Sequence, residues 1–455
     1  MDELLRDAAE RAIRYRAGLD VRAVVPIAEA IEALGDLGGP LPEGPDDPAA
    51  VLAMLDDRGS PATVASAGGR YFGFVTGSSL PVTVAANWLA TAWDQNSALS
   101  VMSPVATRLE QIALPWLCDL LGLPAGCGGS FVTGATMANL VGLAAARHAL
   151  LARAGWDVEA DGLFGAPPLT VLVGAEVHVS LLKALALLGL GRSRVVTVPV
   201  DGQGRMRADA LPALDARTIV CLQAGNVNTG AFAPAETICA AVRESGAWVH
   251  VDGAFGLWAA AAPARAHLAA GFGEADSWAT DAHKWLNVPY DCGLAFVREP
   301  RQLAAAMAPS AAAYLAVGES REPMHHSPES SRRARGVEVW AALQSLGRAG
   351  VADLIERACR HAERFAEGLR AAGYDVLNQV TLNQVLACFG DDEATRAVIA
   401  AVQAEGTCWC GATVWQGRAA MRISVSSWAT TDGDVERSLA AIIRTARALE
   451  ASTAR

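Results

Sequence analysis

Short apolar runs alternate with helix-like stretches through the middle of the chain. An uninterrupted apolar run bounded by turn residues predicts a strand buried on both faces, and intervening helical patterns predict parallel connections. Helical patterns cover 136–154, 180–190 and 234–245. We therefore predict an α/β fold with a mostly parallel seven-stranded sheet. The seven predicted strands are 129–133, 169–173, 194–198, 218–222, 248–251, 276–280 and 293–297.

The flanking segments predict two further parts. Apolar residues at positions 4, 5, 8, 9, 12 and 13 predict an amphipathic first helix. After about residue 345 we expect a long helix over 349–372, strands over 383–388 and 420–425, and a last helix near 432–450. The predicted organisation is an N-terminal helical segment (1–75), a large domain (76–345) and a smaller C-terminal α+β domain (346–455). The weakly periodic segment 305–335 is predicted to be a long loop, which in a compact protein is usually functional.

Composition narrows the class of protein. The net charge of −11 argues against nucleic-acid and anionic-membrane partners. Nine scattered cysteines, with only Cys408 and Cys410 close together, predict reduced thiols in a cytoplasmic protein and indicate no metal site. The first twenty residues mix charges with apolar positions, unlike a signal peptide, and no apolar run predicts a membrane span.

The chain has only two lysines, and nearly all of its 37 Lys and Arg residues are arginine. Lys183 lies in an apolar, helix-like stretch. Lys284 follows a predicted strand in Thr280-Asp-Ala-His-Lys-Trp285. A desolvated lysine can lose its proton and attack a carbonyl, whereas an arginine cannot. Lys284 is therefore a candidate nucleophile, although alone it fits a surface lysine equally well.

Other chemical groups also fall at predicted strand ends, where ligands collect in parallel sheets. Asp252 ends an apolar strand and could pair with a protonated pyridine nitrogen, although such residues more often form turns. Gly134-Ala-Thr136 could bind an anion at a helix N-terminus, although the pattern is usually a simple cap. His178 could stack on an aromatic ring, although a lone histidine is more often structural.

In chain order the four features are Gly134-Ala-Thr136, His178, Asp252 and Lys284. Together they resemble the pocket of pyridoxal 5′-phosphate enzymes. From about residue 65 to 430 the chain resembles the group II pyridoxal-phosphate decarboxylases, which include the aromatic L-amino acid, glutamate and tyrosine decarboxylases. The motifs that carry the resemblance are Ser103–Glu110, Val249-His-Val-Asp-Gly-Ala254, Asp276-Ser-Trp-Ala-Thr-Asp-Ala-His-Lys-Trp285, Asp291-Cys-Gly293 and Ser330-Ser-Arg-Arg-Ala-Arg335.

The resemblance implies the aspartate aminotransferase-like architecture (fold-type I) and an obligate homodimer with shared active sites. It implies that Lys284 forms the internal aldimine and that Asp252 pairs with the pyridine nitrogen. Ala254 and His178 would sandwich the ring, with His178 also near the substrate carboxylate. The phosphate would be held by Ala135, Thr136 and His283, helped by Ser180, and Asn228 or Thr229 would approach the phenolic oxygen.

The implied reaction is decarboxylation of an L-amino acid to an amine and CO₂, through an external aldimine and a quinonoid. Phe74, Val75 and Thr76 resemble the family's side-chain pocket and favour an aromatic or apolar substrate. Two departures matter. Where many members have Asn-Pro-His-Lys, this chain has Asp281-Ala-His-Lys, and because a carboxylate would repel a phosphate we expect Asp281 to point elsewhere or to be hydrogen-bonded.

The second departure concerns the mobile loop in which family decarboxylases often carry a proton-donating tyrosine. This chain has His325 and His326 there, and the nearest tyrosine is Tyr314. A histidine can donate a proton near neutral pH. Loss of the tyrosine also fits related aldehyde synthases, which couple decarboxylation to oxidative deamination. An aminotransferase and a non-catalytic cofactor-binding protein are weaker alternatives.

Overall fold

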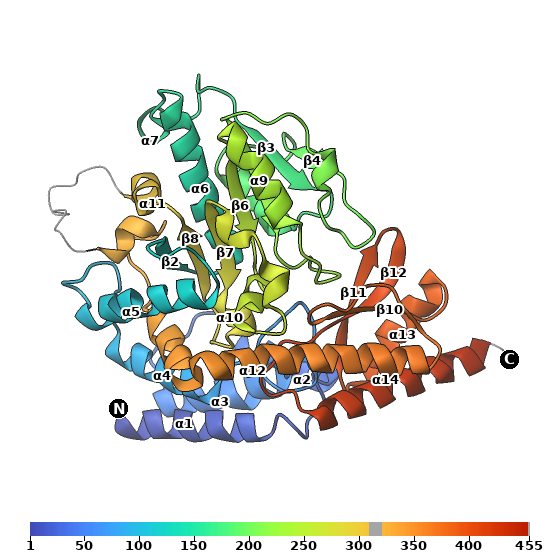
Figure 1. Cartoon of the computed structure of the whole chain (residues 1–455). Helices are drawn as coiled ribbons and strands as arrows, with labels where there is room; N and C mark the ends of the chain where they lie inside the picture. The colour runs from blue at the N-terminus through green and yellow to red at the C-terminus, as the bar shows by residue number, and fades with distance from the viewer. Residues whose placement is uncertain (309–320, 454–455) are drawn as a thin grey trace. The chain divides into compact units, whose positions relative to one another are not determined.

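The computed structural model describes residues 1–308 and 321–453, and the chain forms two compact units (Figure 1). The first unit consists of Met1–Ser78, Glu363–Leu377 and Val385–Arg455. The second unit consists of Ser79–Ala362 and Asn378–Gln384. The second unit contains the seven-stranded sheet and every cofactor-binding candidate.

All seven predicted strands are confirmed and form one sheet in the order β2-β8-β7-β6-β5-β3-β4. Neighbours from β7 through β4 pair in parallel, whereas β8 is antiparallel to both of its neighbours. The carboxyl ends of β6 and β7 therefore meet at the same edge. The strands are β2 (Gly128–Val132), β3 (Thr170–Gly174), β4 (Val196–Val198), β5 (Thr218–Gln223), β6 (Trp248–Asp252), β7 (Ser277–Asp281) and β8 (Gly293–Val297).

The predicted connecting helices are also present. Ser103 caps the helix that begins at Pro104, with its hydroxyl accepting the Ala106 amide at 3.3 Å. The predicted long helix begins earlier, at Gly336, and is broken at Gly347, whose φ of 58° is left-handed. The helices are α4 (Pro81–Trp93), α5 (Pro104–Leu120), α6 (Ala135–Arg153), α7 (Val158–Asp161), α8 (Val179–Leu187), α9 (Ala235–Ser245), α10 (Ala282–Trp285), α11 (Pro300–Met307) and α12 (Gly336–Ala371).

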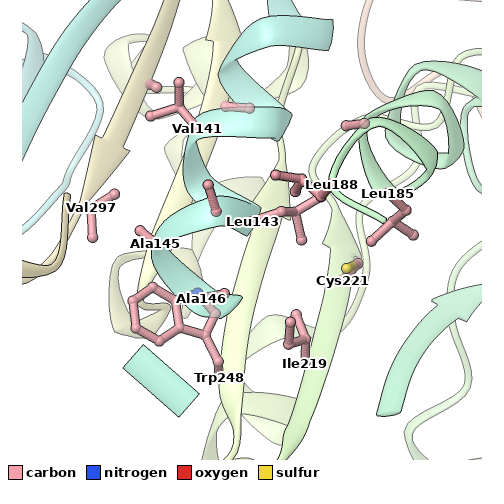
Figure 2. Packing of buried hydrophobic residues seen from close by; sticks show 14 of the residues in the cluster. Val141, Leu143, Ala145, Ala146, Leu185, Leu188, Ile219, Cys221, Trp248 and Val297 are labelled. Carbon is pink, nitrogen blue, oxygen red and sulfur yellow. The ribbon is translucent and has the colours of Figure 1, made fainter. Parts of the chain in front are cut away.

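Helix α6 is the centre of the hydrophobic core in this unit. Its alanine-rich face lies against β6, β7 and β8, and α8 packs beside it (Figure 2). Small side chains let the helix backbone approach the sheet, while Leu143, Leu150 and Trp248 fill the remaining space. Among the described residues, α6 is the one helix long and apolar enough to cross a membrane, but most of it is buried in this core.

A chain of buried polar groups crosses this core from the sheet to α6. Trp248 Nε1 donates to Ser277 Oγ, Ser277 Oγ lies 2.8 Å from His250 Nδ1, and His250 Nε2 lies 2.8 Å from Asn139 Oδ1. An indole nitrogen can only donate and an amide oxygen can only accept, so His250 carries its proton on Nε2 and accepts at Nδ1. The absence of a side chain at Gly142 makes room, because a Cβ there would lie 2.7 Å from His250 Cε1.

The first unit contains a five-stranded sheet in the order β1-β11-β12-β10-β9. The predicted strands 383–388 and 420–425 correspond to β10 and β12. Strand β11 was not predicted. The turn that joins it to β12, Gln416–Gly417, has φ of 49° and 81°, which is typical of a hairpin. The elements are α1 (Asp2–Ala17), α2 (Ala28–Glu32), α3 (Pro48–Ala62), β1 (Tyr71–Phe72), β9 (Asp375–Val376), β10 (Gln384–Cys388), α13 (Asp392–Glu405), β11 (Trp409–Trp415), β12 (Arg418–Ser424) and α14 (Asp432–Thr453). All nine cysteines are free thiols.

The buried histidine predicts how stability depends on pH. Burial lowers the pKa of His250 to about 3, so the folded chain keeps it neutral, whereas in the unfolded chain it titrates near 6.5. Between these values the unfolded state binds the additional proton, and the free energy of unfolding falls as the pH falls. We expect His250→Gln to remove up to about 1.4 kcal/mol per pH unit from this dependence.

Urea unfolding between about pH 7 and about pH 5 measures the effect. The exposed His267 supplies the matched control, and His267→Gln should follow the unmodified chain. Identical pH profiles for His250→Gln and the unmodified chain would show that His250 is already protonated when folded.

Candidate active site

Lys284 lies where β7 passes into the short helix α10. Asn287, with a left-handed φ of 52°, closes this helix by donating its amide to the carbonyls of Lys284 at 3.3 Å and Trp285 at 3.0 Å. The Lys284 side chain is mostly buried, and its Nζ lies 2.9 Å from Oδ2 of Asp281. Lys183, by contrast, is exposed on α8. The structure thus places the two lysines in the environments that their sequence contexts predict.

Asp252 is the last residue of β6 and is only 5% exposed. Burial raises the pKa of its carboxyl, and the nearby His178 and Lys284 side chains oppose this shift without cancelling it. Asn139, at the end of the buried polar chain, also lowers the pKa of Asp252, and within the described residues its Nδ2 has no hydrogen-bond partner. The site therefore contains a buried carboxylate that a further cation would stabilise.

Three predicted phosphate contacts meet at the N-terminus of α6. Ala135 and Thr136 form its first turn, and a Cβ on the preceding Gly134 would lie 3.3 Å from Cε1 of His283. His283 Nδ1 accepts the amide of Cys292 at 3.1 Å, and burial lowers the pKa of His283. The ring is therefore neutral with its proton on Nε2, which lies 3.5 Å from Oδ1 of Asp281.

Of the two alternatives predicted for Asp281, the structure shows the hydrogen-bonded one. Its Oδ1 accepts the Ala135 amide at 2.6 Å, its Oδ2 pairs with Lys284, and the residue is 2% exposed. The ion pair with Lys284, three residues away, was not predicted.

His178 follows β3 and caps α8. Its Nδ1 accepts the backbone amide of Ser180 at 3.3 Å and lies 2.7 Å from the Ser180 hydroxyl. His178 also lowers the pKa of Asp252, which places its ring near that carboxylate. The structure therefore brings together His178, Asp252 and Lys284, whereas Ser180 acts on the His178 ring and its proposed phosphate contact stays a prediction.

The two candidates for the phenolic oxygen lie in the turn after β5. Asn226 Oδ1 accepts the amides of Asn228 at 2.8 Å and Thr229 at 3.2 Å. The Thr229 hydroxyl donates to the Gln203 carbonyl at 2.7 Å and accepts the Ala231 amide, so it already stabilises the turn. Which of the two approaches the phenolic oxygen stays a prediction. Ala254 lies beside Asp252, and its carbonyl accepts the Asp281 amide at 2.9 Å.

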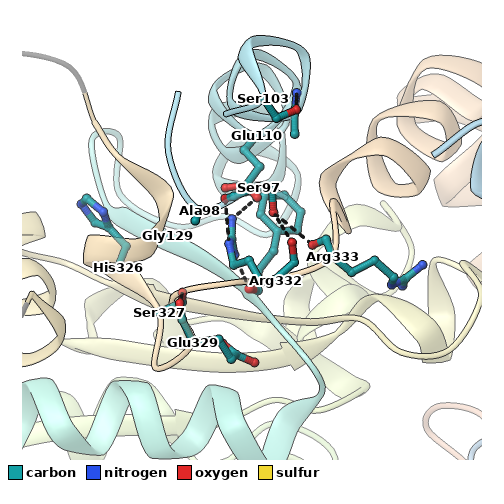
Figure 3. Close-up of polar contacts among 12 residues, drawn as sticks. Ser97, Ala98, Ser103, Glu110, Gly129, His326, Ser327, Glu329, Arg332 and Arg333 are labelled. Carbon is teal, nitrogen blue, oxygen red and sulfur yellow. Dashed lines mark hydrogen bonds and ion pairs between the residues drawn. The ribbon is translucent and has the colours of Figure 1, made fainter. Parts of the chain in front are cut away.

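Glu110 and Arg332 had no predicted role, although each lies in a motif of the resemblance. Arg332 pairs with the fully buried Glu110 and donates to the carbonyls of Phe131 at 2.8 Å and Ser97 at 3.2 Å (Figure 3). Since Phe131 lies on β2 just before Gly134, this ion pair holds the strand that leads into α6. The signal in the sequence for this ion pair was a glutamate in an otherwise apolar helical stretch together with the arginine-rich motif 330–335.

The loop histidines lie on a 3₁₀ turn, Pro323–His326. His326 Nδ1 lies 3.1 Å from the Glu322 carbonyl, and burial and the nearby Arg321 lower the pKa of His326 to about 4. This neutral ring donates at Nδ1 and presents Nε2 as an acceptor. His326 lines a cavity of about 440 Å³ with Cys118 and Arg321, and His325 is half-buried. Their catalytic role stays a prediction, and Tyr314 lies outside the described residues.

The predicted substrate-contacting residues belong to the first unit. Phe74 and Val75 both have a φ of 56°, a left-handed conformation that a β-branched residue such as Val75 rarely adopts. The Phe74 ring is 63% exposed and stacks on Trp409 at 5.3 Å. Thr76 closes the turn by donating its amide to the Gly73 carbonyl. Strain of this kind clusters at functional sites.

The residues of the second unit fit pyridoxal 5′-phosphate. Asp252 supplies a buried anion for the pyridine nitrogen, Lys284 an amine for the aldehyde, and the first turn of α6 with His283 supplies N–H groups for a phosphate. Within the described residues, no group of three or more His, Cys, Asp or Glu side chains could hold a metal ion.

Known proteins give the same identification. The profile of the pyridoxal-dependent decarboxylase conserved domain matches residues 67–390. The chain is 27% identical over 399 residues to tryptophan decarboxylase 1 of Oryza sativa subsp. japonica, covering 79% of this chain and 76% of that protein. It is 29% identical over 392 residues to L-2,4-diaminobutyrate decarboxylase of Rhizobium meliloti (strain 1021), covering 82% and 75%.

Solved structures confirm the fold. The crystal structure of Oryza sativa TDC with PLP and tryptamine superposes with a TM-score of 0.91 at 23% identity, covering 98% of both chains. Rhodiola rosea 4-hydroxyphenylacetaldehyde synthase gives a TM-score of 0.86 at 21% identity, also covering 98% of both chains. The architecture is thus fold-type I, as predicted. Since the family profile matches well over half of its length, the chain belongs to the pyridoxal-dependent decarboxylases and is a pyridoxal-phosphate-dependent amino acid decarboxylase, a lyase.

Proposed function

We propose that this enzyme removes CO₂ from an L-amino acid with an aromatic or apolar side chain and releases the amine. The observation that carries the proposal is that Lys284, in α10 just after β7, lies near enough to Asp252, at the end of β6, to oppose the rise in pKa that burial causes there. Bound pyridoxal phosphate supplies a ring that accepts the electron pair left when CO₂ departs.

Each residue of the site has a distinct task in this proposal. Lys284 Nζ would hold the cofactor covalently. Asp252 would keep a proton on the pyridine nitrogen by its charge. His178 would stack on the ring and lie near the substrate carboxylate, and Ser180, 2.7 Å from its Nδ1, would orient the imidazole.

The identity of the product depends on which group returns a proton to Cα. Residues 321–329 contain His325 and His326 but no tyrosine. In the folded chain, Nε2 of the neutral His326 carries no proton and can only accept a hydrogen bond. We therefore favour His325 as the proton donor. The second candidate function is aldehyde synthesis: without an efficient proton donor, O₂ would take two electrons and form H₂O₂, and hydrolysis would release the aldehyde and ammonia.

A product assay separates these functions and tests Lys284. We expect CO₂ and amine in equal amounts, without ammonia or H₂O₂, because proton return ends the reaction at the amine. Lys284→Ala should lower turnover at least about a thousandfold. Lys183→Ala, which changes the only other lysine, is the matched control and should retain full activity. Ammonia in proportion to CO₂ would instead establish the aldehyde synthase.

Substrate selection is proposed to depend on the rigid turn that presents Phe74. Relatives of the chain are named as decarboxylases of tryptophan, of aromatic amino acids and of diaminobutyrate, so the family name alone leaves the substrate open. The exposed aromatic ring of Phe74 favours an aromatic or apolar partner.

We expect Phe74→Ala to raise KM for an aromatic amino acid about fivefold, since a lost aromatic pair is worth about 1 kcal/mol, with a smaller change in kcat. Steady-state kinetics across the proteinogenic amino acids measure this. Phe164, which is 97% exposed, supplies the control Phe164→Ala. An unchanged KM for every aromatic substrate would remove Phe74 from the substrate site.

The proposed enzyme is a cytoplasmic homodimer with shared active sites. Helices α1, α2 and α3 contain no buried residue, although their exposed side chains include Leu5, Ile13, Ile31 and Leu55. In a single chain these apolar helix faces are exposed to solvent, and a second copy of the chain could bury them at an interface.

Light scattering should therefore give twice the mass of one chain. The double substitution Leu5→Glu/Ile13→Glu should shift the mass toward the monomer, because it places charges on the apolar face. Glu3→Gln/Glu10→Gln changes the same helix at charged positions and is the control. A monomeric unmodified enzyme with full activity would contradict the shared-site proposal.

A further inference from the structure

We propose that Asp281 occupies the phosphate-binding cradle of the cofactor site and competes with the cofactor's phosphate. Asp281 thereby lowers the affinity of the chain for pyridoxal phosphate. It also lowers the preference of the chain for pyridoxal phosphate over unphosphorylated pyridoxal. This inference rests on the proposed assignment of the first turn of α6 and His283 as the phosphate site. It concerns a residue for which neither the family profile nor the resemblance provides a role.

The first support is that Asp281 already uses the donors that a phosphate would need. The Ala135 amide, the first of α6, donates to its Oδ1 at 2.6 Å, and the protonated Nε2 of His283 lies 3.5 Å from the same oxygen. These N–H groups and the positive end of the helix attract any anion. In this structure the anion is the chain's own carboxylate.

The second support is the balance of charge. Lys284 Nζ, 2.9 Å from Oδ2, neutralises Asp281 while the lysine is free. Attachment of Lys284 to the cofactor would draw its nitrogen toward the aldehyde carbon and away from Asp281, and would bring a phosphate to the cradle at the same time. A carboxylate that is 2% exposed is then left beside a second anion with few water molecules to screen the repulsion.

The third support is the side-chain chemistry at this position. The asparagine found here in many family members can donate an amide N–H to a phosphate, whereas an ionised aspartate can only accept. The two side chains have nearly the same shape, so Asp281→Asn removes the charge without opening a cavity. Unphosphorylated pyridoxal has the same aldehyde but no phosphate, so it reports attachment to Lys284 without the repulsion.

The experiment titrates the apoenzyme with pyridoxal phosphate and with pyridoxal, and follows the visible absorbance of the covalently attached cofactor. For Asp281→Asn we expect the dissociation constant for pyridoxal phosphate to fall at least about tenfold, and that for pyridoxal to change less than about threefold. Inorganic phosphate, which needs the same cradle, should compete with pyridoxal phosphate more strongly in the variant than in the unmodified chain. Asp209→Asn, an exposed aspartate paired with Arg207, has the same change in net charge and should leave all three values unchanged.

Two results would overturn the inference. The first is an affinity of Asp281→Asn for pyridoxal phosphate that is equal to or weaker than that of the unmodified chain. The second is an equal gain in affinity for both ligands, which would mean that Asp281 acts only through Lys284. Asp281→Ser, which also removes the charge, should reproduce the gain, and thermal unfolding verifies that both variants fold. Borohydride reduction followed by peptide mass spectrometry keeps the proposed site separate. If the cofactor is not attached to Lys284 of the unmodified chain, the site assignment fails, whereas attachment without a gain in Asp281→Asn refutes this inference alone.

Discussion

Two buried carboxylates end neighbouring parallel strands, and one lysine lies beside both. Asp252 and Asp281 are 5% and 2% exposed, and removing a carboxylate from water costs several kcal/mol, about as much as a small domain's whole stability margin, unless a partner compensates. The parallel pairing of β6 and β7 makes this arrangement unavoidable, because both strands end at the same edge. Lys284 compensates Asp281 directly, and the raised pKa of Asp252 shows that its own burial is compensated only in part.

Much of the surrounding core holds these two carboxylates in place. The buried polar chain from Trp248 to Asn139 has one direction of hydrogen bonding, since an indole can only donate, and it ends with the Asn139 amide near Asp252. Gly142 leaves room for the His250 ring, so α6 can lie close enough to the sheet for His250 and Asn139 to meet. On the other side, Arg332 and Glu110 anchor β2, which positions the first turn of α6 against Asp281. Core packing and site geometry are therefore one set of interactions.

The sheet could be predicted from the sequence because each strand is buried on both faces and reads as an uninterrupted apolar run between turn residues. The same logic located Lys284 and Asp252, since a polar residue directly after such a run must lie at the ligand-binding edge. Strand β11 was missed, because its mixed pattern of buried and exposed residues resembles neither a fully buried strand nor a clean alternation. The turn Gln416–Gly417 was the local signal that could have located its pairing with β12.

Asp281 shows why the electrostatics could not be predicted in the same way. The sequence supplied the charges, but the sign of their summed effect depends on distances. From the sequence, repulsion by a phosphate left two possibilities for the Asp281 side chain, one that points elsewhere and one that is hydrogen-bonded. The structure shows the second, with Lys284 at 2.9 Å and the Ala135 amide at 2.6 Å. Because the compensating cation is also the group that must bind the cofactor, any event at Lys284 changes the environment of Asp281, and the two residues can only be understood as a pair.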